Sequence, residues 1–116
     1  MTTVRTPQQV FQHHGEALVA ANLDEIVRDY ADDAILITAA GVRRGKGEVR
    51  AAFAELLAQL PDASWDIKTT IFADDILYLE WAADSRVYRV TDGVDTFVFE
   101  DGLITAQTVH LTPVPK

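Results

Sequence analysis

The sequence contains no cysteine, and it has only ten basic residues against eighteen acidic ones, which gives a net charge of −8. The absence of cysteine excludes a disulfide scaffold, a cysteine-ligated zinc or iron–sulfur site and a thiol nucleophile. The acidic balance argues against nucleic-acid and membrane partners, because both need clustered cationic charge on the protein. The function is therefore expected to depend on neither.

Long apolar runs are also missing, since no stretch approaches the roughly 20 residues that a transmembrane helix needs. Residues 1–12 are polar and lack the basic and apolar regions of a signal peptide. We therefore expect a cytoplasmic protein. The length of 116 residues, with 48% hydrophobic and 24% charged residues, predicts one globular domain over residues 1–116.

The first half of the sequence has the periodicity of helices. Apolar residues recur at spacings of three and four between Pro7 and Ala21, with Thr6 as the expected N-cap. Asn22 followed by Glu25 predicts a capping box, which opens a second helix that continues to Asp32 and Asp33. A short strand over 34–38 and a third helix from about 46 to 60 are expected to follow.

The second half has the alternation of strands, expected over residues 64–72, 76–83, 86–99 and 103–112. Asp101-Gly102 predicts a tight hairpin, and Asp92-Gly93 predicts either a bulge or another turn. In the first of these strands, one face is expected to carry Trp65, Ile67, Thr69 and Ile71. Helices followed by an antiparallel meander indicate an α+β domain.

His14 interrupts the apolar stripe between Phe11 and Leu18, so its side chain is expected to point inward. It is either a core histidine bonded to a backbone carbonyl or a functional group. His13 lies about 100° around the helix and is expected at the surface. Because adjacent histidines on a helix cannot converge on one ion, no metal site is predicted.

Asp95 shares a strand face with Phe97 and Phe99, so it is expected in apolar surroundings. A carboxyl group there must be paired, hydrogen-bonded or protonated. The alternative is an aspartate that closes the turn at Asp92-Gly93.

Three further sets of side chains leave their orientation open. Tyr78 and Glu80 share one strand face, and Trp81 lies on the other. Gln107 and His110 likewise occupy opposite faces, and we favour a surface position for His110. The basic residues before the third helix are Arg43, Arg44, Lys46 and Arg50. They are expected to be solvated, with capture of one anion at the helix start as the minor alternative.

Three segments resemble the nuclear transport factor 2-like superfamily, which includes ketosteroid isomerases and SnoaL-like polyketide cyclases. They are NLDEIVRDYADDA at 22–34, the pattern Gly45, Val49 and Phe53, and DTFVFEDGLI at 95–104. The resemblance covers about residues 10–111. It implies a curved antiparallel sheet wrapped around the N-terminal helices, a cone-shaped, cystatin-like roll. The open end of that cone would be an apolar pocket for a small molecule.

The resemblance to ketosteroid isomerase also implies roles for single residues. Asp95 matches an aspartate of the oxyanion hole, and His14 stands where that hole has a tyrosine. Thr38 stands at the position of the general-base aspartate. Tyr30 matches a supporting tyrosine, and Phe53 replaces a second one. Because a threonine cannot remove a proton from carbon at neutral pH, true ketosteroid isomerase activity is not expected.

The expected function is therefore that of a small cofactor-independent pocket protein with no metal. It would act on or bind a small apolar molecule, of carbonyl, polyketide or steroid-like type, through an acid/base pair of His14 and Asp95. The alternative is a non-catalytic ligand-binding or dimerisation module, so enzymatic activity stays open. The expected ligand contacts are Tyr30, Thr38, Phe53, Phe97, Tyr78, Trp81 and Gln107.

Two structural expectations follow. His14 and Asp95 should approach within hydrogen-bonding distance, directly or through a water, with the pKa of His14 raised and that of Asp95 lowered. Alternation along residues 86–99 should also place Val87, Val94, Thr96 and Val98, or their neighbours, on the outer face of the sheet. This β-branched surface predicts a homodimer formed through that face.

Overall fold

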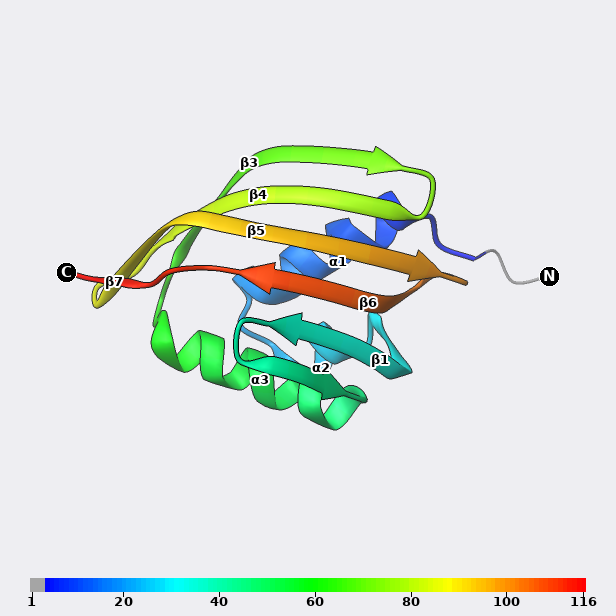
Figure 1. Ribbon diagram of the computed structural model, residues 1–116, viewed down its shortest axis with the longest axis horizontal. Helices are drawn as coiled ribbons and strands as arrows, with labels where there is room; N and C mark the ends of the chain where they lie inside the picture. The colour runs from blue at the N-terminus through cyan, green and yellow to red at the C-terminus, as the bar shows by residue number, and fades with distance from the viewer. Residues whose placement is uncertain (1–3) are drawn as a thin grey trace.

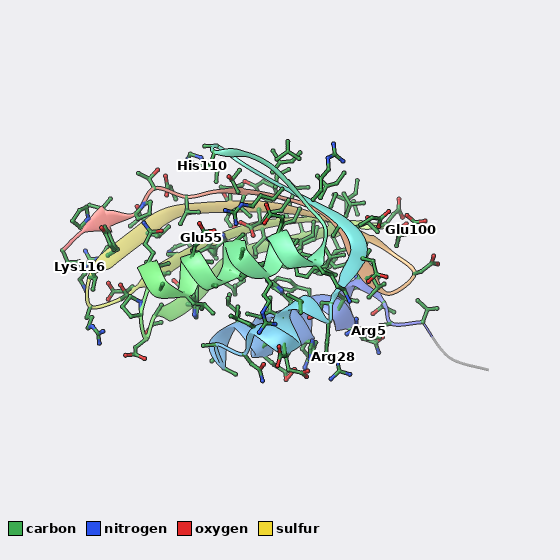
Figure 2. All side chains as sticks on the ribbon, turned by 90° about the horizontal axis from the view of Figure 1, so that it is seen from below. Arg5, Arg28, Glu55, Glu100, His110 and Lys116 are labelled. Atoms are coloured by element: carbon green, nitrogen blue, oxygen red, sulfur yellow. The ribbon has the colours of Figure 1, made fainter. Side chains whose placement is uncertain are left out.

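The computed structural model describes residues 4–116. Its helices are α1 (Pro7–Val19), α2 (Leu23–Val27) and α3 (Lys46–Gln59). Its strands are β1 (Tyr30–Thr38), β2 (Gly41–Arg44), β3 (Ser64–Ala73), β4 (Ile76–Asp84), β5 (Tyr88–Glu100), β6 (Leu103–His110) and β7 (Val114–Pro115). The long strands curve over the helices, which lie together on one side of the sheet (Figures 1 and 2).

The sheet has the strand order β2-β1-β6-β5-β4-β3, and β7 pairs with the start of β5. All neighbouring strands are antiparallel except β1 and β6, which pair in parallel although the elements from β2 to β5 separate them in the sequence. The α+β class and the curved, unclosed sheet around N-terminal helices are thus confirmed. Among residues 4–116, no helix is long and apolar enough to cross a membrane.

The helix starts follow their caps, but the second helix is shorter than predicted. Thr6 forms a capping box with Gln9 at the start of α1. The side chain of Asn22 caps α2 by accepting from the backbone of Glu25. The carboxylate of Glu25 bonds to side chains elsewhere, so the predicted capping box is incomplete. α2 ends at Val27, and Tyr30 already belongs to β1.

The basic segment before α3 contains the short strand β2, which the sequence analysis did not predict. Three cations of the basic cluster, which continues into α3, form ion pairs with acidic residues: Arg43 with Glu55, Lys46 with Asp32, and Arg50 with Asp24. These pairs are exposed or half-exposed, and they compensate the charges of three of the four cations in the cluster. The expectation of solvated side chains therefore holds for this segment.

Register shifts occur in four strand pairings, and two of them decide which side chains face the helices. One lies between Ile67 and Thr69 of β3 and reverses which face the side chains occupy. Trp65 and Ile67 point toward the helices, whereas Thr69 and Ile71 pair with Glu80 and Tyr78 on the convex face. The prediction that all four β3 residues share a face is therefore wrong, because one extra residue inverts the alternation.

The second shift lies in the pairing of β4 with β5, next to Gly93. β5 continues through this point, so Asp92-Gly93 lies at a bulge and not at a turn. Beyond it, Asp95, Phe97 and Phe99 are buried on the concave side, whereas Val94, Thr96 and Val98 are half-buried on the convex side. The predicted alternation in β5 is confirmed, and it turns Asp95 toward the helices.

Candidate small-molecule site

A cavity of about 140 Å³ lies between the concave face of the sheet and helices α1 and α3, and it is partly open to solvent. Its aromatic walls are Phe11, Phe53, Trp65 and Trp81, and its polar side chains are His14, Thr38, Asp95 and Gln107. The rest of the lining is apolar apart from Gly15. An engineered cavity of about 150 Å³ in another protein holds benzene. The enclosed part of this cavity therefore has room for about one ring.

Asp95 is buried and accepts hydrogen bonds on both carboxyl oxygens. The indole Nε1 of Trp81 donates to Oδ1 at 2.8 Å, and Nε2 of Gln107 donates to Oδ2 at 2.9 Å. The hydroxyl of Tyr30 in turn donates to Oε1 of Gln107. Within residues 4–116, Asp95 forms no ion pair, so only neutral donors compensate its charge.

Burial raises the pKa of Asp95 to about 6, against the opposing effect of the Trp81 and Gln107 donors, which favour the charged form. Above that pH the cavity contains an ionised carboxylate. Each carboxylate oxygen retains a further lone pair, so Asp95 can still accept a proton or a hydrogen bond from a ligand.

His14 lies among aromatic rings in the same cavity. Its ring centroid is 5.4 Å from that of Phe97 and 5.6 Å from that of Phe53. Burial lowers the pKa of His14 to about 4, although the charge of Asp29 acts in the opposite direction. Nδ1 of His14 is buried and has no hydrogen-bond partner. His14 is therefore a neutral imidazole at neutral pH, and it is not a core histidine bonded to a carbonyl through that nitrogen.

The expected direct pair of His14 and Asp95 is not formed, although both side chains line one cavity. The oxygens of Asp95 bond to Trp81 and Gln107 instead. Both pKa shifts are opposite to those expected, because desolvation is the largest effect on each group. The two residues thus share a site as a carboxylate and a neutral imidazole, and not as an ion pair.

The structure divides the other predicted contacts into three groups. Thr38, Phe53, Trp81 and Gln107 line the cavity. Tyr30 and Phe97 lie behind this lining and contact it, Tyr30 through Gln107 and Phe97 through the ring of His14. Tyr78 does not reach the cavity.

Tyr78 lies on the convex face and is 39% exposed, because β4 turns Leu77, Leu79 and Trp81 inward. Its prediction as a ligand contact is therefore corrected. His110 is also on the convex side of β6 and points away from the helices (Figure 2), as favoured from the sequence.

Neither the place of Trp65 in the cavity lining nor the close contact of Trp81 with Gly93 was predicted from the sequence. The Trp81 indole lies directly on Gly93, where a Cβ atom would come within 2.3 Å of the ring. A glycine inside a strand is a signal for such close approach. Among residues 4–116, no group of three histidine or acidic side chains is arranged to hold a metal ion.

Comparisons with known proteins agree with this architecture. The family described as the SnoaL-like domain matches residues 11–107. No curated protein matches the sequence. A SnoaL-like protein of unknown function from Burkholderia thailandensis superposes with a TM-score of 0.76 at 23% identity, covering 91% of this chain and 94% of that one.

Two further structures share the fold at lower identity. A candidate ketosteroid isomerase from Kribbella flavida has a TM-score of 0.78 at 15% identity, with 97% of this chain and 82% of that one covered. A de novo designed protein with a curved β-sheet has a TM-score of 0.80 at 13% identity, with 92% and 85% covered. These likenesses describe the fold, so function must be argued from the cavity.

Proposed function

This chain belongs to the SnoaL-like domain family, and we propose that its cavity binds a small, largely apolar carbonyl compound and moves a proton on the carbon next to the carbonyl. One observation carries the proposal. A carboxyl group with a pKa of about 6 and a neutral imidazole line the same apolar cavity. Such a pair supports proton transfer without a cofactor.

Asp95 is the proposed base. Its pKa of about 6 leaves it ionised at neutral pH yet more basic than an exposed aspartate, which is the usual tuning of a general base. A proton leaves the ligand carbon for a carboxylate oxygen of Asp95. The electron pair of the broken C–H bond forms the C=C bond of an enolate. Return of the proton to the same or another carbon completes an exchange or an isomerisation.

His14 is the proposed hydrogen-bond donor to the carbonyl oxygen. A neutral imidazole carries one N–H, and the negative charge that develops on the enolate oxygen strengthens a hydrogen bond from it. Its pKa of about 4 keeps this donor uncharged over the working range. Neutral histidine has this role in at least one other isomerase.

These roles differ from those implied by the resemblance to ketosteroid isomerase. There, Asp95 would be a protonated donor of the oxyanion hole and the base would stand at Thr38. Two N–H donors on Asp95 favour its carboxylate form instead. The base is thus proposed at the β5 position, opposite His14, and Thr38 is proposed as a ligand contact only.

The test uses 2-indanone, a compact ketone with acidic protons next to its carbonyl. The wild-type protein in D₂O at pH 8 should accelerate exchange of these protons, followed by NMR. Asp95→Asn should reduce the accelerated rate by about 10²- to 10⁴-fold, because it removes the base while keeping the shape. Asp92→Asn, on the exposed part of the same strand, is the matched control and should leave the rate unchanged.

Binding is measured separately through the fluorescence of Trp65 and Trp81, which both line the cavity. Indane, which lacks the carbonyl, should bind to the wild type and to Asp95→Asn alike. Binding without accelerated exchange would favour the alternative, a non-catalytic ligand-binding module. Accelerated exchange that Asp95→Asn leaves intact would contradict the role of Asp95.

We also propose a homodimer formed through the convex face of the sheet. Exposed apolar side chains lie on this face in two groups, Ile37 and Val42 on β1 and β2, and Ile71, Ile76 and Tyr78 on β3 and β4. Exposed apolar surface on one face of a sheet is typical of an interface. Light scattering at micromolar concentration should give twice the 12.8 kDa chain mass, and Ile71→Lys should give the single mass. A wild-type monomer would contradict this assembly.

A further inference from the structure

We propose that Tyr30 and Gly93, neither of which lines the cavity, are positioning residues that keep Asp95 a carboxylate. Tyr30 acts through Gln107, and Gly93 acts through Trp81. The inference rests on the proposed function only in naming Asp95 the base. These two series of contacts reach the two oxygens of Asp95 from the strands on either side of β5, namely β4 and β6.

The first series of contacts passes through Trp81. An indole nitrogen can only donate a hydrogen bond, so Trp81 always presents N–H to Oδ1 of Asp95. Trp81 and Gly93 are register partners on β4 and β5. A Cβ atom at position 93 would lie 2.3 Å from Cδ2 and Cε2 of the indole. Only glycine therefore leaves room for the ring orientation that aims Nε1 at Asp95.

The second series of contacts passes through Gln107. A glutamine amide can present either its oxygen or its NH₂ group to a neighbour, and it presents NH₂ to Asp95 most favourably when its oxygen has a donor of its own. The Tyr30 hydroxyl donates to Oε1 of Gln107, so Nε2 faces Oδ2 of Asp95 at 2.9 Å. Burial raises the pKa of Tyr30 well above its usual value, so this hydroxyl keeps its proton and remains a donor.

These donors decide the protonation of Asp95 because no cation does. The titratable groups around Asp95 are His14 from α1 and Tyr30 from β1, and both are uncharged at neutral pH. Burial favours the neutral acid, whereas the two N–H donors favour the carboxylate. The resulting pKa of about 6 lies so close to neutrality that losing one donor leaves about half of Asp95 protonated at pH 7.

The experiment follows the ¹³Cγ signal of Asp95 by NMR over pH 4–9 in Trp81→Phe, Tyr30→Phe and Gly93→Ala. Trp81→Phe removes one hydrogen bond to the charged group and should raise the midpoint by about one unit. Tyr30→Phe and Gly93→Ala act through Gln107 and Trp81, so they should raise the midpoint in the same direction by less. Trp65→Phe removes an indole from the same cavity without touching the hydrogen bonds of Asp95. Tyr88→Phe removes a hydroxyl elsewhere in the sheet. Both controls should keep the wild-type midpoint.

An unmoved midpoint in Tyr30→Phe would overturn the role of Tyr30. An unmoved midpoint in Trp81→Phe would overturn the role of Gly93, which acts through Trp81, whether or not Gly93→Ala folds. The titration needs no turnover, so its failure is distinct from that of the proposed function. Shifted midpoints in a protein that exchanges no 2-indanone protons would support the positioning role and contradict the proposed function. The reverse pattern would keep Asp95 as the base and remove Tyr30 and Gly93 from its control.

Discussion

Two buried aspartates, Asp29 and Asp95, show how the same carboxyl group becomes a structural or a chemical element. Asp29 is fully buried and lies 2.9 Å from a guanidinium nitrogen of Arg5 and 2.7 Å from Nδ1 of His13. Asp95 has only the neutral donors of Trp81 and Gln107. Asp95 lines the cavity of about 140 Å³, whereas Asp29 is not part of its lining.

The neighbouring histidines repeat this contrast. Hydrogen bonding to Asp29 raises the pKa of His13, whereas burial lowers that of His14 to about 4. His13 also bonds to Glu25, and Arg5 donates to the backbone of Gly102, so charged partners tie three segments together. Compensated charge thus fastens the N-terminal segment to the fold. In the cavity, Asp95 has neutral donors but no cationic partner, so its carboxylate can still bind a ligand or accept a proton.

Replacing each aspartate by asparagine should separate the two roles by the largest margin. Asp29→Asn should lower the free energy of unfolding by about 3 kcal/mol, because it breaks a buried ion pair and leaves its partners uncompensated. Asp95→Asn should cost far less stability while abolishing proton exchange. Urea unfolding measures both, with Asp24→Asn, an exposed ion-pair residue, as the control. Equal losses at positions 29 and 95 would erase the distinction.

A second way to sharpen the contrast is the pH dependence of stability. The pKa of His14 falls from 6.5 to about 4 on folding, so its effect lowers stability as pH falls through that window. The pKa of Asp95 rises from 3.8 to about 6, so its effect raises stability as pH falls from 6 toward 4. The two effects oppose each other in the wild type.

Replacing either residue should therefore reveal the effect of the other on the pH dependence of stability. Relative to wild type, Asp95→Asn should lose about 1.4 kcal/mol of unfolding free energy per pH unit between pH 6 and 4. His14→Phe places a ring that fits the aromatic surroundings, and its unfolding free energy relative to wild type should rise by a similar amount per unit as pH falls from 6 to 4. Urea titrations at several pH values measure both differences. Parallel curves for wild type and both variants would contradict the assigned pKa shifts.

A third prediction concerns the charge of the ligand. A carboxylate without a cationic partner should favour a cation over an anion of the same shape. At pH 8, 2-aminoindane should bind about tenfold more tightly than indane-2-carboxylate, a difference of about 1.4 kcal/mol. Asp95→Asn should remove this preference, as measured by tryptophan fluorescence. A preference that persists in Asp95→Asn would place its origin elsewhere.

The smallest effect is expected at His13. Because folding raises its pKa above 6.5, its contribution to stability is complete below pH 6.5 and is lost as pH rises through the folded value. His13→Gln should therefore be less stable than wild type at pH 6, by under about 1 kcal/mol for this partly exposed pair, and equal to it at high pH. His110→Gln is the control at an exposed histidine. A difference that grows with pH would reverse the assigned sign.

Local signals in the sequence were sufficient for much of this arrangement. Thr6 marks the start of α1, Asp101-Gly102 forms the last hairpin, and alternation turns Asp95 inward. The extra residue in β3 and the early end of α2 depend on pairing between distant segments, so short-range patterns did not reveal them. The same holds for the partners of Asp95, which come from two other strands.

The protonation states at the site illustrate the limit in another way. A carboxyl group and an imidazole predicted in one pocket were expected to pair, which would raise the pKa of His14 and lower that of Asp95. Their actual shifts depend on how completely the fold removes water and on which donors reach Asp95 first. These are properties of packing that residue spacing does not contain.

The most direct test of the account is the pH dependence of proton exchange in 2-indanone, after subtraction of the buffer rate. If Asp95 is a carboxylate base beside a neutral His14, the protein-dependent rate should rise through a single midpoint near pH 6 and then stay level. A rate that falls as pH rises through 6 would show that Asp95 works as a protonated donor instead, which would contradict the account.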